Sequence, residues 1–415
     1  MLIGPDYPSP FFNCFIRIYY VMDIRGKITL KKGKSFSIER FHPWIFSGAI
    51  QSSDGTIHDG DWVEIFQHNG KSLGTGHFQE GSITVRMLTF GERPRPDFYT
   101  QKLASALLLR TASHLPGDST NCFRWINAEG DGLPGLIIDW YDGVAIVQAH
   151  SHGMHADREK ICLAIQNVWG ENVKSVFYKS QSTLFARSSD EHIDRYLYGL
   201  GGVPHVVHEN NNKFYVDWED GQKTGFFLDQ RDNRKLLGRY SKGKKVLNTF
   251  CYTGGFSIYA IAEGADAVHS VDSSEKAITL ARKNIELNLF DESNHQCFTA
   301  DTFDFIKDKQ DKYDLIVLDP PAFAKKRDSR HQAVKGYQRL NAEAMRIIRP
   351  GGIIFTFSCS QVVDKKLFYD TVVSAAIQAQ RQVKVLHHLS QPADHPVSMF
   401  HPEGEYLKGL VLYVE

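Results

Sequence analysis

Apolar and polar residues alternate over short runs near the start of the chain, a pattern typical of half-buried β-strands. Asn69-Gly70 separates two such runs and predicts a tight hairpin turn between them. The stretch 91–96 holds two prolines, which cannot extend a strand ladder, and therefore indicates a linker. We expect a small β-rich domain over residues 22–95. Its expected strands are 28–30, 60–66 and 82–88.

The next part of the chain mixes helical and strand-like periods. Apolar residues recur at helical spacing over 98–114 and 158–169, and a glycine- and proline-rich turn lies at 130–135. We expect a compact α+β middle domain over residues 96–204, in which 186–203 show no clear pattern. Its expected strands are 123–127, 136–140, 143–149 and 175–179.

From about residue 205 apolar strands and amphipathic helices alternate. This order implies right-handed crossovers and a parallel sheet with helices on both faces. One helical run ends at Ala262, and another covers 275–289 with a clear 3.6-residue period. We therefore expect a doubly wound α/β domain over residues 205–415. Its expected strands are 245–248, 267–271, 296–299, 313–318 and 352–357.

Length, charge and cysteine usage narrow the class of protein. A chain of 415 residues with 42% hydrophobic residues is long enough for two or three domains with cores of their own. Lys+Arg and Asp+Glu are equal at 48 each, which excludes a uniformly basic protein but not a local basic patch. The six cysteines form no C-x-x-C pair, so we expect no metal site, no disulfide framework and a cytoplasmic location.

The first 21 residues do not resemble the rest of the chain. The apolar stretch 11–22 is interrupted by Asn13 and Arg17 and is shorter than the ~20 residues that a membrane span requires. A signal peptide is the alternative, but no basic segment precedes the stretch and no small-residue cleavage pattern follows it. We expect no membrane segment and interpret 1–21 as an extension upstream of Met22 or a mis-assigned start.

Strand ends of the last domain carry side chains suited to a nucleoside-bearing cofactor. Ligands of doubly wound sheets lie at the carboxyl ends of the strands, where a glycine turn lets the backbone approach them closely. Asp272 can accept both ribose hydroxyls, and Asp301 can meet an adenine amino group. The turn can also be a mere tight connection, and either aspartate a helix N-cap. The other residues concerned are Asn248, Phe250, Tyr252, Thr253, Gly254, Gly255 and Ser273.

Asp319 and two prolines follow the fourth expected strand directly. The prolines stiffen the loop and hold Asp319 and Phe323 in fixed positions. Together with the strand-end acids, this motif resembles the class I, Rossmann-like methyltransferases, whose fourth motif is Asp/Asn-Pro-Pro-Phe/Tyr. The resemblance implies that S-adenosylmethionine binds among these residues, Asp319 included, and leaves as S-adenosylhomocysteine. It also implies cofactor contacts from the segment before the first strand, through Phe227, Asp229, Gln230 and Arg231.

Cys359 follows the fifth expected strand and should lie beside Asp319 at the same sheet edge. A thiolate adds well to soft electrophilic carbons, and methylation of a pyrimidine at C5 needs such a group. Addition to C6 makes C5 enamine-like, so that it can attack the sulfonium methyl. A base then removes the C5 proton and the thiol is eliminated. An isolated cysteine at a strand end is often structural, but the place opposite Asp-Pro-Pro favours a nucleophile.

From Met22 to its end the chain resembles the bacterial 23S rRNA cytosine-C5 methyltransferases that carry an N-terminal PUA domain. This resemblance implies that 22–95 is the PUA domain, that Cys359 is the nucleophile, and that Asp319 contacts the N3/N4 edge of cytosine. It also implies an RNA partner, large-subunit rRNA, and a homodimer. The residues that carry it are 42–49, 127–135, 225–231, 318–323, Ser358-Cys359-Ser360, 393–396 and 402–404.

One departure from related RNA methyltransferases leaves proton removal open. Those enzymes often carry a second cysteine after the fourth-motif prolines, where this chain has Ala322. The loops around His395 and His401 offer candidate bases or RNA contacts, although buried or capping histidines are as common.

Two groups of basic residues are candidate RNA contacts, and the alternative for each is a solvated face. One group precedes the His42-Pro43-Trp44 motif, and the other follows Asp-Pro-Pro, where Phe323 could stack on an unstacked base. The first group is Lys31, Lys32, Lys34 and Arg40, and the second begins with Lys325 and Lys326.

Two other functions remain open from the residues alone. The first is methylation of a base nitrogen, since Asp-Pro-Pro motifs also serve amino-nitrogen chemistry, in which case Cys359 is incidental. The second is a non-catalytic RNA-binding or assembly factor that keeps the fold. Loss of activity on replacing Cys359 separates the first from C5 chemistry, and binding of S-adenosylmethionine argues against the second.

Overall fold

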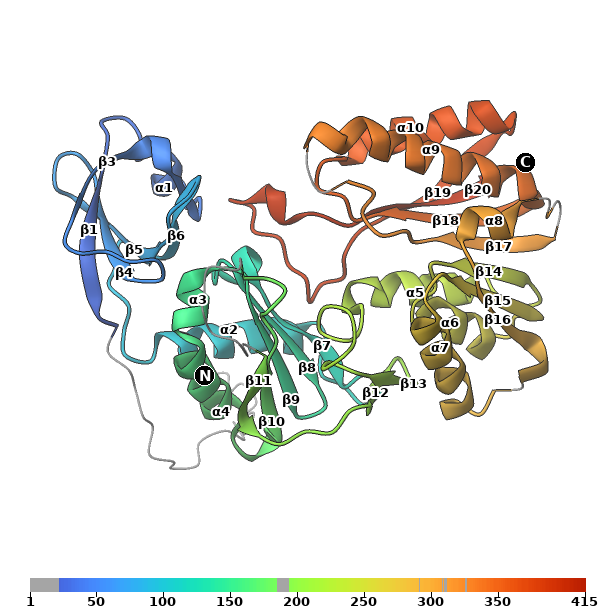
Figure 1. Cartoon of the computed structure of the whole chain (residues 1–415), viewed down its shortest axis with the longest axis horizontal. Helices are drawn as coiled ribbons and strands as arrows, with labels where there is room; N and C mark the ends of the chain where they lie inside the picture. Colours follow the sequence, from blue (N-terminus) through green and yellow to red (C-terminus); the bar gives the residue numbers. More distant parts are fainter. Residues whose placement is uncertain (1–21, 185–193, 291, 308, 310–311, 325–326) are drawn as a thin grey trace, which may run out of the picture. The chain divides into compact units, whose positions relative to one another are not determined.

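A computed structural model describes residues 22–415, except 185–193, 291, 308, 310–311 and 325–326. The described chain divides into two compact units, each built from segments that are distant in sequence (Figure 1). Unit 1 contains the described part of Met1–Ser113 together with Trp125–Gly201 and Ser398–His401. Unit 2 contains His114–Arg124, Gly202–Val397 and Pro402–Glu415. The interpretation of 1–21 as an extension lies outside the described residues.

A six-stranded sheet in the order β2-β6-β5-β4-β1-β3 forms the first part of unit 1. The expected hairpin is present, because β4 and β5 pair antiparallel on either side of Asn69-Gly70, and Gly70 has a φ of 84°. Ile28, Val63 and Val85 are fully buried between the strands and contribute to the core. The elements are β1 (Ile24–Leu30), α1 (Phe36–Glu39), β2 (Trp44–Phe46), β3 (Ile50–Asp54), β4 (Trp62–Phe66), β5 (Ser72–Phe78) and β6 (Ile83–Phe90).

The middle part of the chain is α+β, as expected, with a five-stranded sheet in the order β11-β10-β9-β8-β7. Helices α2 and α4 pack against each other beside it. Strand β11 lies in the connection 186–203, where the sequence shows no clear pattern, and residues 185–193 of that connection are not described. The elements are α2 (Phe98–Ala112), β7 (Cys122–Asn127), β8 (Leu136–Tyr141), β9 (Val144–Ala149), α3 (His152–Ala156), α4 (Arg158–Trp169), β10 (Ser175–Tyr178) and β11 (Arg195–Gly199).

Unit 2 holds a seven-stranded sheet in the order β16-β15-β14-β17-β18-β20-β19. The first five of these strands are parallel, as expected, but β20 runs antiparallel to both β18 and β19. The strands β19 and β20 were not among the expected elements, and they pair antiparallel because a loop joins them and not a crossover helix. The strands are β14 (Lys245–Thr249), β15 (Ala267–Asp272), β16 (His295–Thr299), β17 (Tyr313–Leu318), β18 (Ile348–Ser358), β19 (Val383–Leu389) and β20 (Lys408–Val414).

Helices cover both faces of this sheet (Figure 1). Helices α5 and α6 form one core with the sheet around Leu237, Val246 and Phe256, and α9 and α10 form the other around Tyr337 and Phe368. Helices α9 and α10 and the hairpin of β12 and β13 were not among the expected elements. The remaining elements are β12 (His205–Glu209), β13 (Asn212–Val216), α5 (Arg231–Arg239), α6 (Gly255–Ala262), α7 (Glu275–Leu287), α8 (Thr302–Ile306), α9 (Arg330–Ile347) and α10 (Lys365–Ala379).

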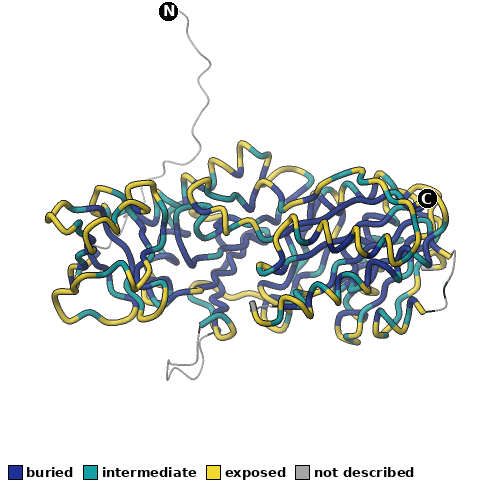
Figure 2. Tube along the Cα trace, turned by 90° about the horizontal axis from the view of Figure 1, so that it is seen from above, coloured by how far each residue is buried: buried dark blue, intermediate teal, exposed yellow. Residues whose placement is uncertain are grey.

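The strand order reverses between β14 and β17, which lie side by side although β15 and β16 come between them in the chain. Ligands of doubly wound sheets bind beyond the carboxyl ends of the strands at such a switch point. Within each unit the strands are mostly buried and drawn in dark blue, while most loops are exposed or intermediate and drawn in yellow or teal (Figure 2). No described helix is long and apolar enough to span a membrane.

Candidate functional site

The loop after β14 holds two residues other than glycine in the left-handed conformation. Phe250 has a φ of 53° and Tyr252 a φ of 48°, and Gly254, with a φ of 80°, is the N-cap of α6. Such strained backbone is uncommon and gathers at binding sites. A Cβ at Gly254 would also lie 3.2 Å from the Cβ of Ala281, so packing as well as backbone conformation requires glycine there.

Asp272, the last residue of β15, fixes this loop. Its Oδ2 accepts a hydrogen bond from the N–H of Tyr252 at 2.9 Å, and its Oδ1 accepts one from the N–H of Ser274 at 2.9 Å. Ser274 caps α7 by accepting from the N–H of Ala277, so the alternative that Asp272 is the cap is wrong. A carboxylate can accept about four hydrogen bonds, which leaves Asp272 capacity for two hydroxyl groups.

The segment that precedes α5 packs on the same loop. The rings of Phe227 and Tyr252 meet edge to face with centroids 5.1 Å apart, and the Tyr252 hydroxyl accepts from the N–H of Gln222 at 3.1 Å. Asn248 donates to Ser257 at 2.9 Å, while its own Oδ1 is buried with no hydrogen bond to any described residue. The structure therefore brings together the two segments that the sequence singled out for cofactor binding.

A buried ion pair supports this segment from behind. Arg234 donates to both carboxylate oxygens of Glu209, at 2.8 and 2.7 Å, and to the carbonyl of Phe227 at 2.9 Å. The hydroxyl of Tyr259 adds a further hydrogen bond to Glu209 at 3.0 Å. A buried charge network with its partners in place holds one geometry, because any other arrangement leaves a charge uncompensated.

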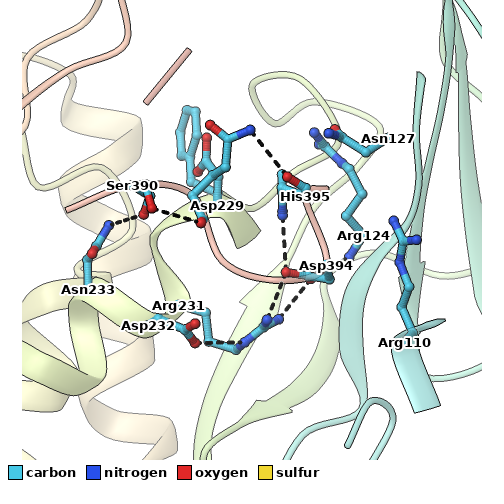
Figure 3. Close-up of polar contacts among 12 residues, drawn as sticks. Arg110, Arg124, Asn127, Asp229, Arg231, Asp232, Asn233, Ser390, Asp394 and His395 are labelled. Atoms are coloured by element: carbon cyan, nitrogen blue, oxygen red, sulfur yellow. Dashed lines mark hydrogen bonds and ion pairs between the residues drawn. The ribbon is translucent and has the colours of Figure 1, made fainter. Parts of the chain in front are cut away.

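Arg231 and Asp394 form a second buried ion pair (Figure 3). The guanidinium of Arg231, a predicted cofactor contact, donates to both oxygens of Asp394, at 2.9 and 2.8 Å. Asp394 also accepts the backbone N–H of Arg124 at 3.0 Å and contacts Nδ1 of His395 at 3.1 Å. Although burial opposes ionisation, His395 and Arg231 hold the pKa of Asp394 well below its usual range. Nε2 of His395 is buried and has no hydrogen bond to any described residue.

Asp319 and Asp229 form a pair of carboxyl groups whose pKa values move apart. Burial and the charge of Asp229 raise the pKa of Asp319 to about 7, against the hydrogen bond that Gln230 donates to it at 3.0 Å. Burial acts in the same sense on Asp229, but the charge of His395 and the 2.7 Å hydrogen bond from Tyr406 contribute to a pKa that is lowered overall. Opposite shifts of this kind keep one carboxyl partly protonated beside an ionised one near neutral pH.

Cys359 and Asp319 leave neighbouring strands at one edge of the sheet. Cys359 follows β18 and Asp319 follows β17, and the two strands are parallel with Leu318 opposite Thr356. The hydroxyl of Ser360 ties the two loops together by donating to the carbonyl of Ala324 at 2.7 Å. Burial and the nearby Asp319 raise the pKa of the Cys359 thiol.

The side chains around the loop after β14 fit S-adenosylmethionine. The cofactor carries hydroxyl and amino groups that donate hydrogen bonds, and the site presents acceptors in need of donors. These are the unpartnered Oδ1 atoms of Asn248 and Asp229 and the remaining lone pairs of Asp272. The residues that would hold it are Phe227, Asp229, Asn248, Phe250, Tyr252, Thr253, Gly254, Gly255 and Asp272.

Other predicted site residues have structural partners of their own. Asp301 caps α8 by accepting N–H groups of its first turn at 2.8 and 3.2 Å, which is the alternative considered for it. Ser273 is exposed beside Asp272. Phe323 is half-buried, with its ring 4.6 Å from that of Tyr337. Lys325 and Lys326 lie outside the described residues.

Two exposed aromatic rings, those of Phe41 and Phe400, form what we call the exposed aromatic surface of unit 1. In unit 1 the ring of Phe400 lies 5.3 Å from that of Phe41, and both side chains are half exposed, at 53% and 51%. The ring of His401 packs on that of Trp44, with centroids 4.3 Å apart. Arg40 lies over Phe36 at 5.1 Å. The predicted contacts Lys31, Lys32, Lys34 and Arg40 are all exposed.

Three residues in and near the site were not predicted from the sequence. Glu209 and Arg234 are too far apart in the chain for a spacing to reveal their ion pair. Lys408 begins the otherwise apolar run 408–414, and a lysine at the first position of a buried strand is the signal that could have drawn attention to it.

The chain matches the family model of S-adenosylmethionine-dependent methyltransferases over residues 130–403 and that of PUA-like domains over residues 28–90. It is 39% identical over 395 residues to ribosomal RNA large subunit methyltransferase I of Alteromonas mediterranea, which covers 94% of this chain and 99% of that protein. Identity to the protein of the same name from Aeromonas hydrophila is 40% over 395 residues, with 93% and 99% covered.

Among solved structures, the crystal structure of SMU.776 complexed with S-adenosylhomocysteine superposes with a TM-score of 0.80 at 24% identity. The superposition covers 94% of this chain and 100% of that one. These findings confirm the expected fold class, with a β-rich PUA-like domain, a middle domain and a Rossmann-like methyltransferase sheet.

Proposed function

Because the chain belongs to the ribosomal RNA large subunit methyltransferase I family, we propose that it methylates C5 of a cytosine in 23S rRNA through a covalent adduct at Cys359. The enzyme depends on S-adenosylmethionine, as its family does. The substrate base and the covalent step are the parts that we propose. In this proposal the reaction takes place at the carboxyl ends of β17 and β18.

One observation carries the proposal. Cys359 and Asp319 extend from adjacent parallel strands, and the hydrogen bond from Ser360 to Ala324 fixes the spacing of the two loops. A base nitrogen can be methylated with its own lone pair and requires no thiol at this place. Carbon C5 of cytosine does require one, because the ring carbon becomes nucleophilic only after an addition at C6.

The chain's own groups perform the steps at the base. The Cys359 thiolate forms a bond to C6, and the C5–C6 π electrons move so that C5 becomes nucleophilic. When bound, S-adenosylmethionine supplies the electrophilic methyl group for C5. A base then removes the C5 proton, the C5–C6 double bond reforms and the thiolate is expelled.

Asp319 is suited to hold the N3/N4 edge of the cytosine. A carboxyl group with a pKa of about 7 is protonated in part of the molecules at neutral pH. It can therefore donate a hydrogen bond to N3, which offsets the negative charge that enters the ring on thiolate addition. Gln230 keeps the carboxyl in position through its 3.0 Å hydrogen bond.

His395 is our candidate for the group that removes the C5 proton. Its Nδ1 is held by Asp394 at 3.1 Å, which leaves Nε2 to act as the acceptor. The neutral imidazole accepts the proton, and the imidazolium that forms is stabilised by the carboxylates of Asp394 and Asp229, on which its charge acts.

We also propose that RNA contacts the exposed aromatic surface of unit 1. Unstacked bases stack on aromatic rings, and neighbouring lysines and arginines bind the phosphates. Phe41 and Phe400 offer half-exposed rings, with Lys31, Lys34 and Arg40 exposed in the same domain.

Nucleoside mass spectrometry of rRNA methylated by the purified full chain tests the proposal. Large-subunit rRNA incubated with wild-type protein and the cofactor is expected to gain 5-methylcytidine. The variant Cys359→Ala should give none, whereas the control Cys297→Ala, which changes a half-buried cysteine of β16, should retain activity. A methyl group on a base nitrogen, or 5-methylcytidine at normal rate from Cys359→Ala, would contradict the covalent mechanism.

A further inference from the structure

Lys408 is a buried lysine next to the turn that carries Cys359. It is the first residue of β20, and it pairs with Ser358, the last residue of β18. Its side chain is 6% exposed, and its Nζ donates to the carbonyl of Ser360 at 2.7 Å. The ammonium group therefore holds the backbone of the residue that directly follows Cys359.

No carboxylate pairs with this ammonium group among the described residues. Besides Cys359, the acids that act on it are Asp364 and Glu405, and both are engaged elsewhere. Glu405 pairs with Lys365 at 2.5 Å, and Asp364 caps α10 by accepting the N–H of its third residue at 2.8 Å. Burying a lysine without a carboxylate partner is costly, so a structural purpose alone would favour an apolar residue or a neutral donor.

The thiol of Cys359 is the acidic group left to act as its partner. Burial lowers the pKa of Lys408 to about 8, and the influence of Cys359 opposes that fall. Burial raises the pKa of Cys359, with Asp319 and Asp229 acting in the same sense and Lys223 against them. The pKa of the lysine therefore falls while that of the thiol rises, and below about pH 8 the lysine carries the charge that can stabilise a thiolate.

We propose that Lys408 is a positioning residue that stabilises the thiolate of Cys359 and fixes its direction through the carbonyl of Ser360. The ammonium group of Lys408 stabilises the thiolate that remains when Sγ of Cys359 gives its proton to water. The same ammonium group stabilises the thiolate when it is expelled from C6. This last consequence rests on the proposed function, whereas the state of the thiol does not.

Alkylation of Cys359 by iodoacetamide tests the proposal without RNA or cofactor. The full-length protein is treated at pH 6 to 10, and the rate is read by mass spectrometry of the peptide that contains Cys359. Lys408→Gln keeps a donor for the Ser360 carbonyl but removes the charge. We expect its pH midpoint to rise by about one unit, so that alkylation at pH 7 slows about tenfold. Lys384→Gln, at an exposed lysine of β19, is the matched control and should behave as wild type.

The outcomes separate the two proposals. A Lys408→Gln midpoint equal to that of wild type would overturn the role of Lys408, because a purely structural hydrogen bond does not set the thiol pKa. If the midpoint rises while Cys359→Ala still makes 5-methylcytidine, the pairing stands and the proposed covalent mechanism fails. Lys408→Met, which lacks both donor and charge, should show the same midpoint as Lys408→Gln. A midpoint shift seen only with Lys408→Met would assign the effect to the lost hydrogen bond and contradict the proposal.

Discussion

Replacing Asp319 with asparagine should change how the stability of the protein depends on pH. Asparagine keeps the size of the side chain and an oxygen that accepts from Gln230, but it cannot ionise. In the wild type the pKa of Asp319 rises from 3.8 to about 7 on folding. A raised pKa contributes stability that is fully present below pH 4 and is lost as the pH rises through 7. The variant should not show this loss.

The magnitude follows from the pKa. A rise from 3.8 to about 7, at 1.36 kcal/mol for each pKa unit, gives an upper limit of about 4 kcal/mol. The Asp319 side chain is only half-buried, so water screens part of this cost and we expect about 2 kcal/mol. As the pH rises from 4 to 8, the free energy of unfolding of Asp319→Asn should therefore increase by about 2 kcal/mol relative to that of the wild type.

Urea unfolding of the full chain at several pH values measures this difference. Asp266→Asn, which removes an exposed aspartate of the same unit, is the control and should follow the wild-type curve. A difference between Asp319→Asn and wild type that stays constant to within about 0.5 kcal/mol from pH 4 to pH 8 would refute the reasoning. It would mean that Asp319 is ionised throughout and cannot donate to N3.

Four further outcomes are expected. Asp394→Ala should lower the free energy of unfolding in urea by about 3–5 kcal/mol, because it leaves the buried Arg231 without its carboxylate partner. The double variant Arg231→Met with Asp394→Leu should recover most of the lost stability. Asp272→Asn should weaken S-adenosylmethionine binding about 10–100-fold by calorimetry, because it removes charged hydrogen bonds to the ribose. His395→Gln should let the RNA adduct accumulate on denaturing gels, because the C5 proton stays in place. Phe41→Ala should weaken binding of an rRNA fragment by about 1–3 kcal/mol in a filter assay, with an unchanged salt slope.

The sequence was most informative where local chemistry dictates structure. Asn69-Gly70 determines a hairpin by itself. The strand-end positions of Asp319 and Cys359 follow from the regular alternation of apolar strands and amphipathic helices. Both residues could be placed at one sheet edge because parallel strands end on the same side. The fold class could be predicted for the same reason.

Long-range pairing is what the sequence could not show. Arg231 was predicted as a cofactor contact, yet its guanidinium binds Asp394, which comes 163 positions later in the chain. The antiparallel β20 depends on a return by a loop and not by a helix, and its register places Lys408 against Ser358. Neither contact leaves a periodic signal, since each is set by tertiary packing.

The exposed aromatic surface of unit 1 has the same origin. Phe41 and Phe400 lie far apart in sequence, and only the structure places their rings 5.3 Å from each other. The sequence singled out the motif beside Phe41 and the loop around His401 separately. Their contact could not be inferred from either.

Trapping the reaction on modified RNA tests the central claim most directly. An rRNA fragment with 5-fluorocytidine at the target carries no proton at C5 that a base could remove, so the adduct formed by Cys359 cannot resolve after methyl transfer. We predict a band of protein bound to RNA that survives denaturation, requires S-adenosylmethionine and maps by mass spectrometry to the peptide containing Cys359. The absence of such an adduct, or an adduct that persists in Cys359→Ala, would contradict the proposed mechanism.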